Sequence, residues 1–130
     1  MDVLDDIARV AKDNNCKSHI DGARIFNASV SSSLSTQRMA REYDTISICL
    51  SKGLGAPVGS VLVGPSETLY KAHRWRKMFG GGMRQAGVLA AAGIYALDNN
   101  VDRLSKDHLR ARKIAEAVNS MDSYSVDLKH

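Results

Sequence analysis

Two short strand-like segments, separated by one helix-length connection, constrain the fold of this chain more than any other feature. Residues 45–51 alternate branched apolar residues with small ones, a pattern that predicts a half-buried strand. Residues 16–21 form a shorter extended stretch, which Gly22 ends. Because strands joined by a helix usually pair in parallel, the pattern predicts an α/β fold in which at least these two strands are parallel neighbours.

Further helices and a third strand are expected around this pair. Periodicity and turn residues predict helices at residues 3–13, 23–30, 65–79, 83–97 and 102–121, and a strand at 58–63. A solvated serine-rich loop is expected at residues 29–35, and residues 125–128 are predicted to begin another strand.

Two of these helices carry an expectation about burial. The helix at residues 83–97 is nearly uncharged and apolar all round, so it is predicted to be buried between other elements. The last helix is amphipathic. Its inward-facing residues are predicted to be Leu104, Ala111, Ile114, Val118 and Met121.

Composition excludes several classes of protein. With 130 residues and 44% hydrophobic content, the chain is long enough for one domain and too apolar for a disordered segment. Its two cysteines, Cys16 and Cys49, have no metal-binding spacing, so neither a disulfide scaffold nor a metal site is expected. No uncharged stretch approaches the roughly 20 residues that a bilayer requires. The acidic N-terminus is unlike a signal peptide, and the net charge of +4 is mild, so a cytoplasmic protein without membrane or nucleic-acid partners is expected.

A carboxylate and an amine stand at the ends of the two predicted parallel strands. Asp21 ends the first and Lys52 the second, after 30 intervening residues (22–51). Ligands of open α/β sheets bind beyond the carboxyl ends of the strands, where these two residues are expected to meet. Three interpretations remain open from the residues alone: a structural salt bridge, a phosphate site in the glycine-rich turn 52–57, or a Schiff-base lysine for pyridoxal 5′-phosphate (PLP) with an acid for its pyridine nitrogen.

Three ordered motifs resemble those of the threonine aldolase family. Residues 19–28 (HIDGARIFNA) resemble the aspartate strand of that family, and residues 47–61 (SICLSKGLGAPVGSV) resemble its lysine segment. A third resemblance lies in residues 74–78 (RWRKM) with 80–87 (GGGMRQAG). Together with their linkers, these motifs span about residues 1–120. The chain is therefore identified as a member of the family, within the beta-eliminating lyase superfamily.

The resemblance implies a fold and a reaction. It implies part of a fold type I, aspartate-aminotransferase-like architecture. Residues 1–100 would belong to the PLP-binding large domain, and residues 101–130 to a linker helix and the beginning of the small domain. The implied reaction is PLP-dependent aldol cleavage of L-threonine or L-allo-threonine, small amino-acid substrates, to glycine and acetaldehyde. The family also implies a homo-oligomer.

The resemblance also implies roles for single residues. Lys52 matches the catalytic lysine that holds PLP as an aldimine, and Asp21 matches the acid beside the pyridine nitrogen. Arg24 matches an arginine near the cofactor and the substrate carboxylate. Arg84 and Lys77 match basic residues of a stretch that approaches the site of a neighbouring subunit.

His19 is the one candidate that comes from strand geometry alone. Its side chain shares a strand face with Asp21, two residues away, so it is predicted to lie near the Asp21 carboxylate and help to orient it. The alternative is a hydrogen-bonded core histidine without a role in the site.

The chain is much shorter than the family architecture. The turn that holds the cofactor phosphate and the histidine that stacks on the ring find no match in it. The expected alternative to an active aldolase is therefore a truncated, inactive homologue or an oligomerisation remnant. Strand edges and helix faces without cover are expected to cause self-association.

Overall fold

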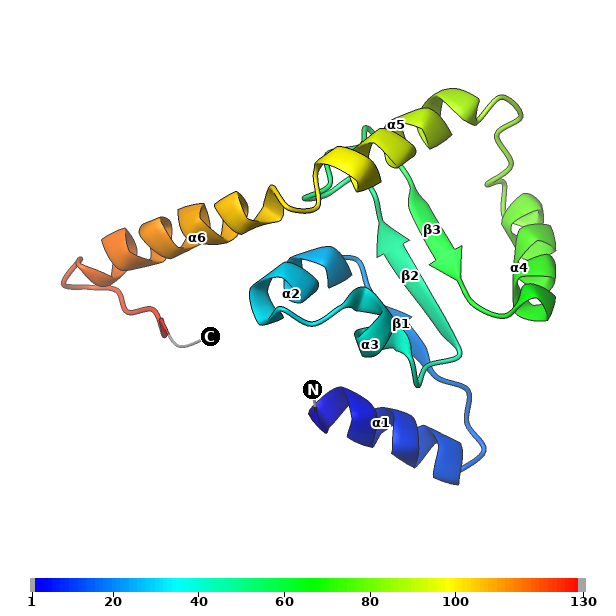
Figure 1. The fold of residues 1–130 in the computed structure, drawn as a ribbon, viewed down its shortest axis with the longest axis horizontal. Coiled ribbons are helices and arrows are strands. Elements are labelled where there is room, and N and C mark those ends of the chain that lie inside the picture. The colour runs from blue at the N-terminus through cyan, green and yellow to red at the C-terminus, as the bar shows by residue number, and fades with distance from the viewer. Residues whose placement is uncertain (1, 129–130) are drawn as a thin grey trace.

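The computed structural model describes residues 2–128, and within this range the chain forms six helices and one three-stranded sheet (Figure 1). The elements are α1 (Asp2–Asp13), β1 (His19–Asp21), α2 (Ile25–Ser32), α3 (Thr36–Ala40), β2 (Thr45–Cys49), β3 (Ser60–Val63), α4 (Ser66–Met78), α5 (Gly87–Asn99) and α6 (Leu104–Asn119). The strands lie in the order β1–β2–β3.

The sheet is mixed. β1 and β2 pair in parallel, with Ile20 opposite Ile46, and α2 and α3 form the connection between them. β3 runs antiparallel to β2, with Val61 opposite Ile48, because the turn between them is too short for a crossover. The predicted α/β class and the parallel pairing of the first two strands are confirmed.

The two faces of the sheet are covered differently. Ile46 packs with Ile25 of α2 and Met39 of α3 in one buried cluster. Neighbouring residues of a strand point to opposite faces, so His19 and Asp21 lie on the other face, and both are exposed. The carboxyl end of the sheet therefore presents an open face that carries polar and small side chains.

A second cluster forms where the chain turns from α5 into α6. Leu104 is fully buried and packs with Ala96 of α5 and with Leu54 and Ala56 of the turn after β2. Burial of a leucine side chain contributes about 1.5–3 kcal/mol to folding. This cluster therefore joins the end of α5 and the start of α6 to the carboxyl edge of the sheet.

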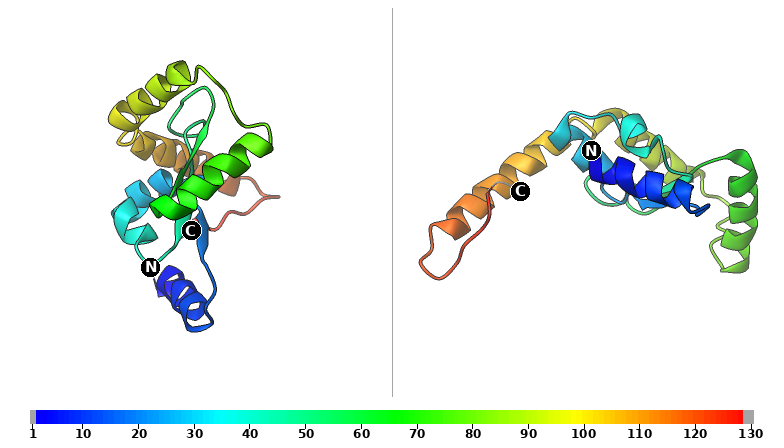
Figure 2. Two further views of the ribbon diagram at one scale, coloured as in Figure 1. Left: turned by 90° about the vertical axis from the view of Figure 1, so that its right-hand side faces the viewer. Right: turned by 90° about the horizontal axis from the view of Figure 1, so that it is seen from below.

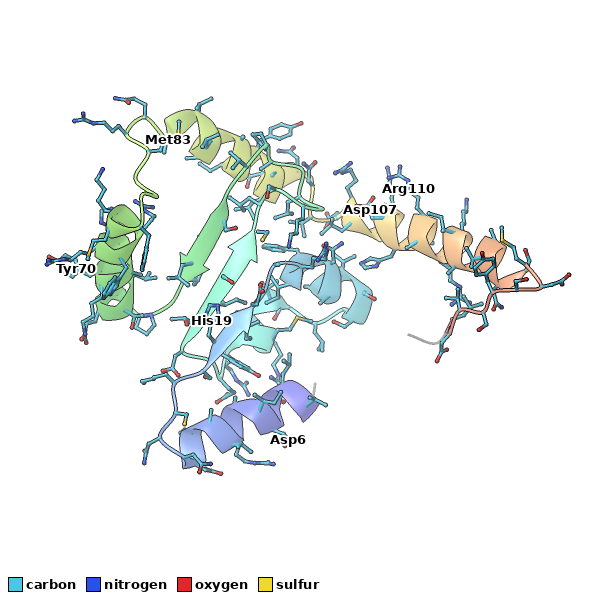
Figure 3. The ribbon with its side chains drawn as sticks, turned by 180° about the vertical axis from the view of Figure 1, so that it is seen from behind. Asp6, His19, Tyr70, Met83, Asp107 and Arg110 are labelled. Carbon is cyan, nitrogen blue, oxygen red and sulfur yellow. The ribbon has the colours of Figure 1, made fainter. Side chains whose placement is uncertain are left out.

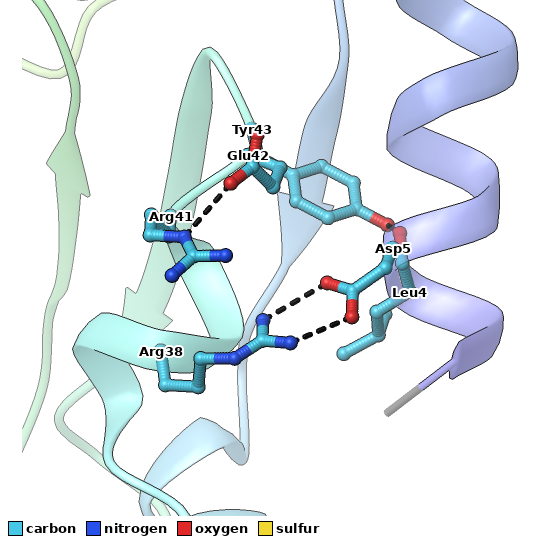
Figure 4. A network of polar contacts seen from close by, with 6 residues as sticks. All are labelled: Leu4, Asp5, Arg38, Arg41, Glu42 and Tyr43. Atoms are coloured by element: carbon cyan, nitrogen blue, oxygen red, sulfur yellow. Dashed lines mark hydrogen bonds and ion pairs between the residues drawn. The ribbon is translucent and has the colours of Figure 1, made fainter.

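The first helix is attached to the rest of the molecule by polar contacts (Figure 4). Arg38 of α3 donates two hydrogen bonds, of 2.9 and 2.7 Å, to the Asp5 carboxylate. The Tyr43 hydroxyl donates to the Leu4 carbonyl at 2.9 Å. The hydrogen bond from Arg38 holds the pKa of Asp5 below its ordinary value. The helix ends before Asn15, whose φ of 54° is left-handed, as expected for an asparagine after a helix.

The prediction that the apolar helix is buried is wrong for the described chain. α5 begins at Gly87 rather than at residue 83, and Val88, Ile94 and Tyr95 are exposed. α6 extends away from the sheet as an arm (Figure 2). Its Leu104 is buried as predicted, whereas Ile114 and Met121 are exposed. The reason is the same for both helices, since the described residues place no element against these faces.

Two local predictions are also wrong. α2 continues to Ser32, so the predicted loop at residues 29–35 is helical over its first half. Hydroxyl groups take part in this helix end: Ser32 donates to the Ala28 carbonyl, and Ser29 donates to the Leu34 carbonyl. Residues 125–128 form no strand because no other strand lies beside them. Between residues 2 and 128, no helix is both long and apolar enough to cross a membrane.

Candidate active site

Asp21 stands at the carboxyl end of β1, where the chain turns sharply into α2. Its carboxylate accepts a hydrogen bond of 3.2 Å from the Ala23 backbone N–H, which begins this turn. The next residue, Gly22, is buried, and a Cβ there would lie 2.7 Å from the Ile46 side chain and 2.9 Å from the Ser47 carbonyl oxygen. Glycine is therefore required for the Asp21 turn to pack against β2.

Arg24 lies at the start of α2, directly after this turn. It is exposed, and together with Asp21 it lines a pocket of about 270 Å³ at the end of β1, whose other walls include Ile25 and Met39 on the covered side of the sheet. A carboxylate and a guanidinium group thus share one opening without forming an ion pair within residues 2–128. This arrangement leaves both groups able to bind a zwitterionic or anionic ligand.

Lys52 lies in the turn that connects β2 to β3. The Gly55 N–H donates to the Lys52 carbonyl at 2.9 Å, and the Ala56 N–H donates to the Leu50 carbonyl at 3.0 Å. Gly55 has a φ of 77°, a conformation that favours glycine. The Lys52 side chain itself is exposed. The backbone of the turn is therefore ordered, and the amine is accessible.

The structure distinguishes among the three interpretations of Asp21 and Lys52. The two residues form no ion pair in the described chain, so a structural salt bridge between them is not realised. The turn after Lys52 leads into a strand rather than a helix, so it lacks the helix N-terminus on which a P-loop depends. The third interpretation, a site that uses the carboxylate and the amine separately, stays a prediction.

The open face beside Asp21 carries small side chains on β2, with Leu62 of β3 opposite Ser47. Ser47 lies opposite Asp21 on β2, and Cys49 continues the same face of that strand. The Ser60 hydroxyl of β3 donates to the Cys49 sulfur at 3.5 Å. On this face Asp21 stands at one side of the small residues of β2, and the Lys52 turn lies beyond their carboxyl end. An acid and an amine are the two groups that PLP requires of its site, so the chemistry of the residues present is compatible with this cofactor.

His19 has a partner other than the predicted one. Its Nδ1 lies 2.8 Å from the Thr45 hydroxyl oxygen, across the β1–β2 pair. The side chain occupies the same open face as Asp21, as the strand alternation requires. Its effect on the orientation of Asp21 stays a prediction.

Lys77 and Arg84 lie apart from the other candidates. Lys77 is on α4, with its side chain beside Gly82, and the exposed Arg84 lies in the loop between α4 and α5. Figure 3 shows Tyr70 of α4 and Met83 of this loop at one end of the molecule, opposite Asp107 and Arg110 of α6. Within this chain the candidates thus form two groups, one at the carboxyl edge of the sheet and one around α4.

Sequence patterns missed the residues that contact the Lys52 turn from the junction between α5 and α6. The Asn100 side-chain amide donates to the Leu54 carbonyl at 2.7 Å, and an Arg103 guanidinium N–H donates to the Gly53 carbonyl at 3.4 Å. The acceptors are backbone carbonyls, which leave no residue-specific signal in a sequence. No cluster of metal-ligating side chains occurs among residues 2–128.

Comparison with known proteins places the chain among lyases. The family model for beta-eliminating lyases matches residues 1–130. A low-specificity L-threonine aldolase of Escherichia coli K12 is 55% identical over 107 residues, 82% of this chain and 32% of that protein. Low-specificity L-threonine aldolase 1 of Arabidopsis thaliana is 46% identical over 122 residues, 94% of this chain and 34% of that protein.

Solved structures agree on the fold. A protein of Listeria monocytogenes, provisionally assigned as an L-allo-threonine aldolase, superposes with a TM-score of 0.85 at 21% identity, over 92% of this chain and 33% of that one. A second structure, from Exiguobacterium and provisionally assigned as an aromatic amino acid beta-eliminating lyase/threonine aldolase, gives a TM-score of 0.83 at 27% identity, over 92% and 34%. The chain thus spans about a third of the length of the relatives it matches.

Proposed function

The chain belongs to the beta-eliminating lyase family, and from this premise we propose that it carries the lysine and the aspartate of a PLP-dependent threonine aldolase site. The observation that carries the proposal is the placement of Asp21 and Lys52 beyond the carboxyl ends of two parallel neighbouring strands. The names of the two relatives at 55% and 46% identity support the reaction class.

The proposed roles follow from the chemistry of the side chains. PLP, when bound, would supply a ring that withdraws electrons from the substrate α-carbon. The Asp21 carboxylate would hold a proton on the ring nitrogen, and the Lys52 amine would bind the aldehyde carbon and carry a proton near the reacting carbon. Arg24 would bind the substrate carboxylate, and His19 would orient Asp21 across the open strand face.

The proposed substrates are L-threonine and L-allo-threonine. In the reaction the β-hydroxyl group loses a proton, the bond between Cα and Cβ breaks, and Cα gains a proton, so that acetaldehyde and glycine form. Residues 1–100 would contribute to the cofactor-binding domain, and residues 101–130 would form the linker helix and the beginning of the small domain. A cytoplasmic location without nucleic-acid or membrane partners belongs to the same proposal.

Reductive trapping tests the role of Lys52. The chain is incubated with PLP, reduced with borohydride and analysed by peptide mass spectrometry. We expect the cofactor to be attached at Lys52 in the unmodified chain. The control is Lys106→Ala, which removes an exposed lysine of α6 and should leave attachment at Lys52 unchanged. In Lys52→Ala the peptide that contains position 52 should carry no cofactor. Equal attachment to all exposed lysines would contradict the proposed site.

A second candidate function is an oligomerisation module that retains cofactor contact without turnover. The observation that favours it is the exposed aromatic surface of α4, where Trp75 and Phe79 stack with ring centroids 5.9 Å apart. Lys77 and Arg84, which flank this surface, would then face the site of a second copy in a homo-oligomer. Trapping at Lys52 without release of glycine from threonine would favour this candidate over the aldolase.

A further inference from the structure

We propose that Asn100, at the junction between α5 and α6, is a positioning residue that fixes the Lys52 turn. The inference rests on the proposed role of Lys52, but its structural basis is independent of any cofactor. Asn100 contacts neither Asp21 nor the Lys52 side chain. It acts through the backbone of the turn that carries Lys52.

The contact is a side-chain hydrogen bond to the middle of the turn. The Asn100 amide donates to the Leu54 carbonyl at 2.7 Å, two residues after Lys52 and 46 residues from Asn100 in the chain. The Arg103 guanidinium group adds a longer bond of 3.4 Å to the Gly53 carbonyl. The turn's own backbone bonds use the carbonyls of Leu50 and Lys52. The two carbonyls between Lys52 and Gly55 therefore find donors in the α5–α6 junction.

Packing holds the junction in place around these bonds. Leu104 and Ala96, at 0% and 1% exposure, enclose Leu54 at 3%. A Cβ at Gly53 would lie 2.7 Å from the Leu104 side chain. The turn and the junction are thus in van der Waals contact at the residue next to Lys52, so that neither can shift without the other.

Helix α6, which follows the junction, also contacts the segment after Asp21. His108 of α6 has its Nε2 3.0 Å from the Asn27 carbonyl oxygen of α2. The Asn27 side-chain oxygen lies 3.1 Å from where a Cβ of Gly53 would stand. The junction therefore contacts the lysine turn, and α6 contacts the helix that follows the aspartate, so a movement of α6 would alter the spacing of the two segments.

The neighbouring residue provides a matched control. Asn99 has the same side chain, one position earlier, but its amide donates to the Tyr95 carbonyl within its own helix. Asn99→Ala removes an amide without touching the turn. Asn100→Ala removes the bond to Leu54, Asn100→Asp retains the size but not the donor, and Asn100→Gln retains a donor on a longer side chain.

Amide hydrogen exchange of the full chain, followed by NMR without cofactor, tests the inference. We expect exchange at Gly55 and Ala56 to become about five- to tenfold faster in Asn100→Ala and Asn100→Asp, as for the loss of one hydrogen bond. Asn99→Ala should leave the exchange rates of Gly55 and Ala56 unchanged. Asn100→Gln should retain part of the protection that Asn100→Ala loses. Ile48 in the β2–β3 ladder serves as the internal reference for general unfolding.

Trapping of PLP supplies the functional readout. In Asn100→Ala the ratio of attachment at Lys52 to attachment at Lys106 should fall, whereas in Asn99→Ala it should not. Unchanged exchange at Gly55 and Ala56 in both Asn100→Ala and Asn100→Asp overturns this inference, even if Lys52 is trapped normally. A different combination is faster exchange at Gly55 and Ala56 in the Asn100 variants together with no PLP attachment at Lys52 in the unmodified chain. That result supports the role of Asn100 in fixing the turn and overturns only the proposed function.

Discussion

Gly22 shows how closely the turn after Asp21 lies against β2. A methyl group at this position would meet both a side chain and a backbone oxygen within 3 Å, and the backbone of β2 cannot move aside. We expect Gly22→Ala to lower the free energy of unfolding by about 1–3 kcal/mol, the usual cost of an overpacked core position. Chemical denaturation measures this change.

Gly87 provides the control for that substitution. It is the first residue of α5, and a Cβ there would meet nothing within 4 Å. Gly87→Ala should therefore leave the free energy of unfolding unchanged or raise it slightly, because alanine favours a helix. A loss of stability in Gly87→Ala equal to that in Gly22→Ala would show that the space beside Gly22 is not the cause.

Single residues differ in how far a sequence can reveal their roles. The position of Asp21 and Lys52 at one edge of the sheet could be predicted, because parallel pairing follows from the length of the connection. The partner of His19 could not, since Thr45 faces it only through the strand register. The role of Asn100 depends on a carbonyl 46 residues away, and the sequence around it indicates only the end of a helix.

The attachment of α1 to α3 depends on the charge of Asp5. Because the pKa of Asp5 is lowered in the folded chain by the hydrogen bond from Arg38, the contribution of this pair to stability is complete above the ordinary pKa of 3.8. It is lost as the pH falls through the lower folded pKa. We expect the amides of α1 to lose protection below pH 3.8 in the unmodified chain, as measured by hydrogen exchange.

Removing the charge of Arg38 should lower the hydrogen-exchange protection of α1 at neutral pH, as protonation of Asp5 does in acid. Arg38→Gln is expected to reduce the protection of α1 at pH 7 and to weaken its dependence on acid. Arg9→Gln is the control, because the ion pair of Arg9 is with Asp6, inside α1 itself. Equal loss of protection in both variants would indicate that the intrinsic stability of α1, rather than its attachment, had changed.

The sequence predicts secondary structure correctly where the residue pattern is local, as in β2. It predicts burial wrongly where burial depends on neighbouring elements, as in α5. The alternation of β2 identified a strand because one face packs on α2 and α3. The serines at positions 29 and 32 predict a loop, whereas in the structure they are helical and their hydroxyls donate to nearby carbonyls. The composition of α5 predicts burial, but within residues 2–128 Val88 and Ile94 are exposed.

The molecule as a whole exposes aromatic residues on α4. Trp75 is 55% exposed, and Phe79, which stacks on it directly after α4, is 83% exposed. Apolar patches of this kind mark surfaces that associate. We expect light scattering to give a mass above 14.1 kDa that rises with concentration. The double variant Trp75→Glu, Phe79→Glu should shift it toward 14.1 kDa.

Thr68→Glu is the matched control for this surface. It adds a negative charge on the same helix at an exposed residue without removing an aromatic ring. Its mass should follow that of the unmodified chain. A concentration-independent mass of 14.1 kDa for the unmodified chain would exclude self-association through α4.

The contacts of the Lys52 turn also imply an order in which they form during folding. The Ser60–Cys49 contact of the β2–β3 hairpin closes over 11 residues, the His19–Thr45 contact between β1 and β2 over 26, and the Asn100–Leu54 bond over 46. Closure entropy grows with the length of the loop, and a chain leaves the ribosome from its N-terminus. The strand that leads to Lys52 is therefore expected to form early, whereas the turn is fixed only after residue 100 has been synthesised.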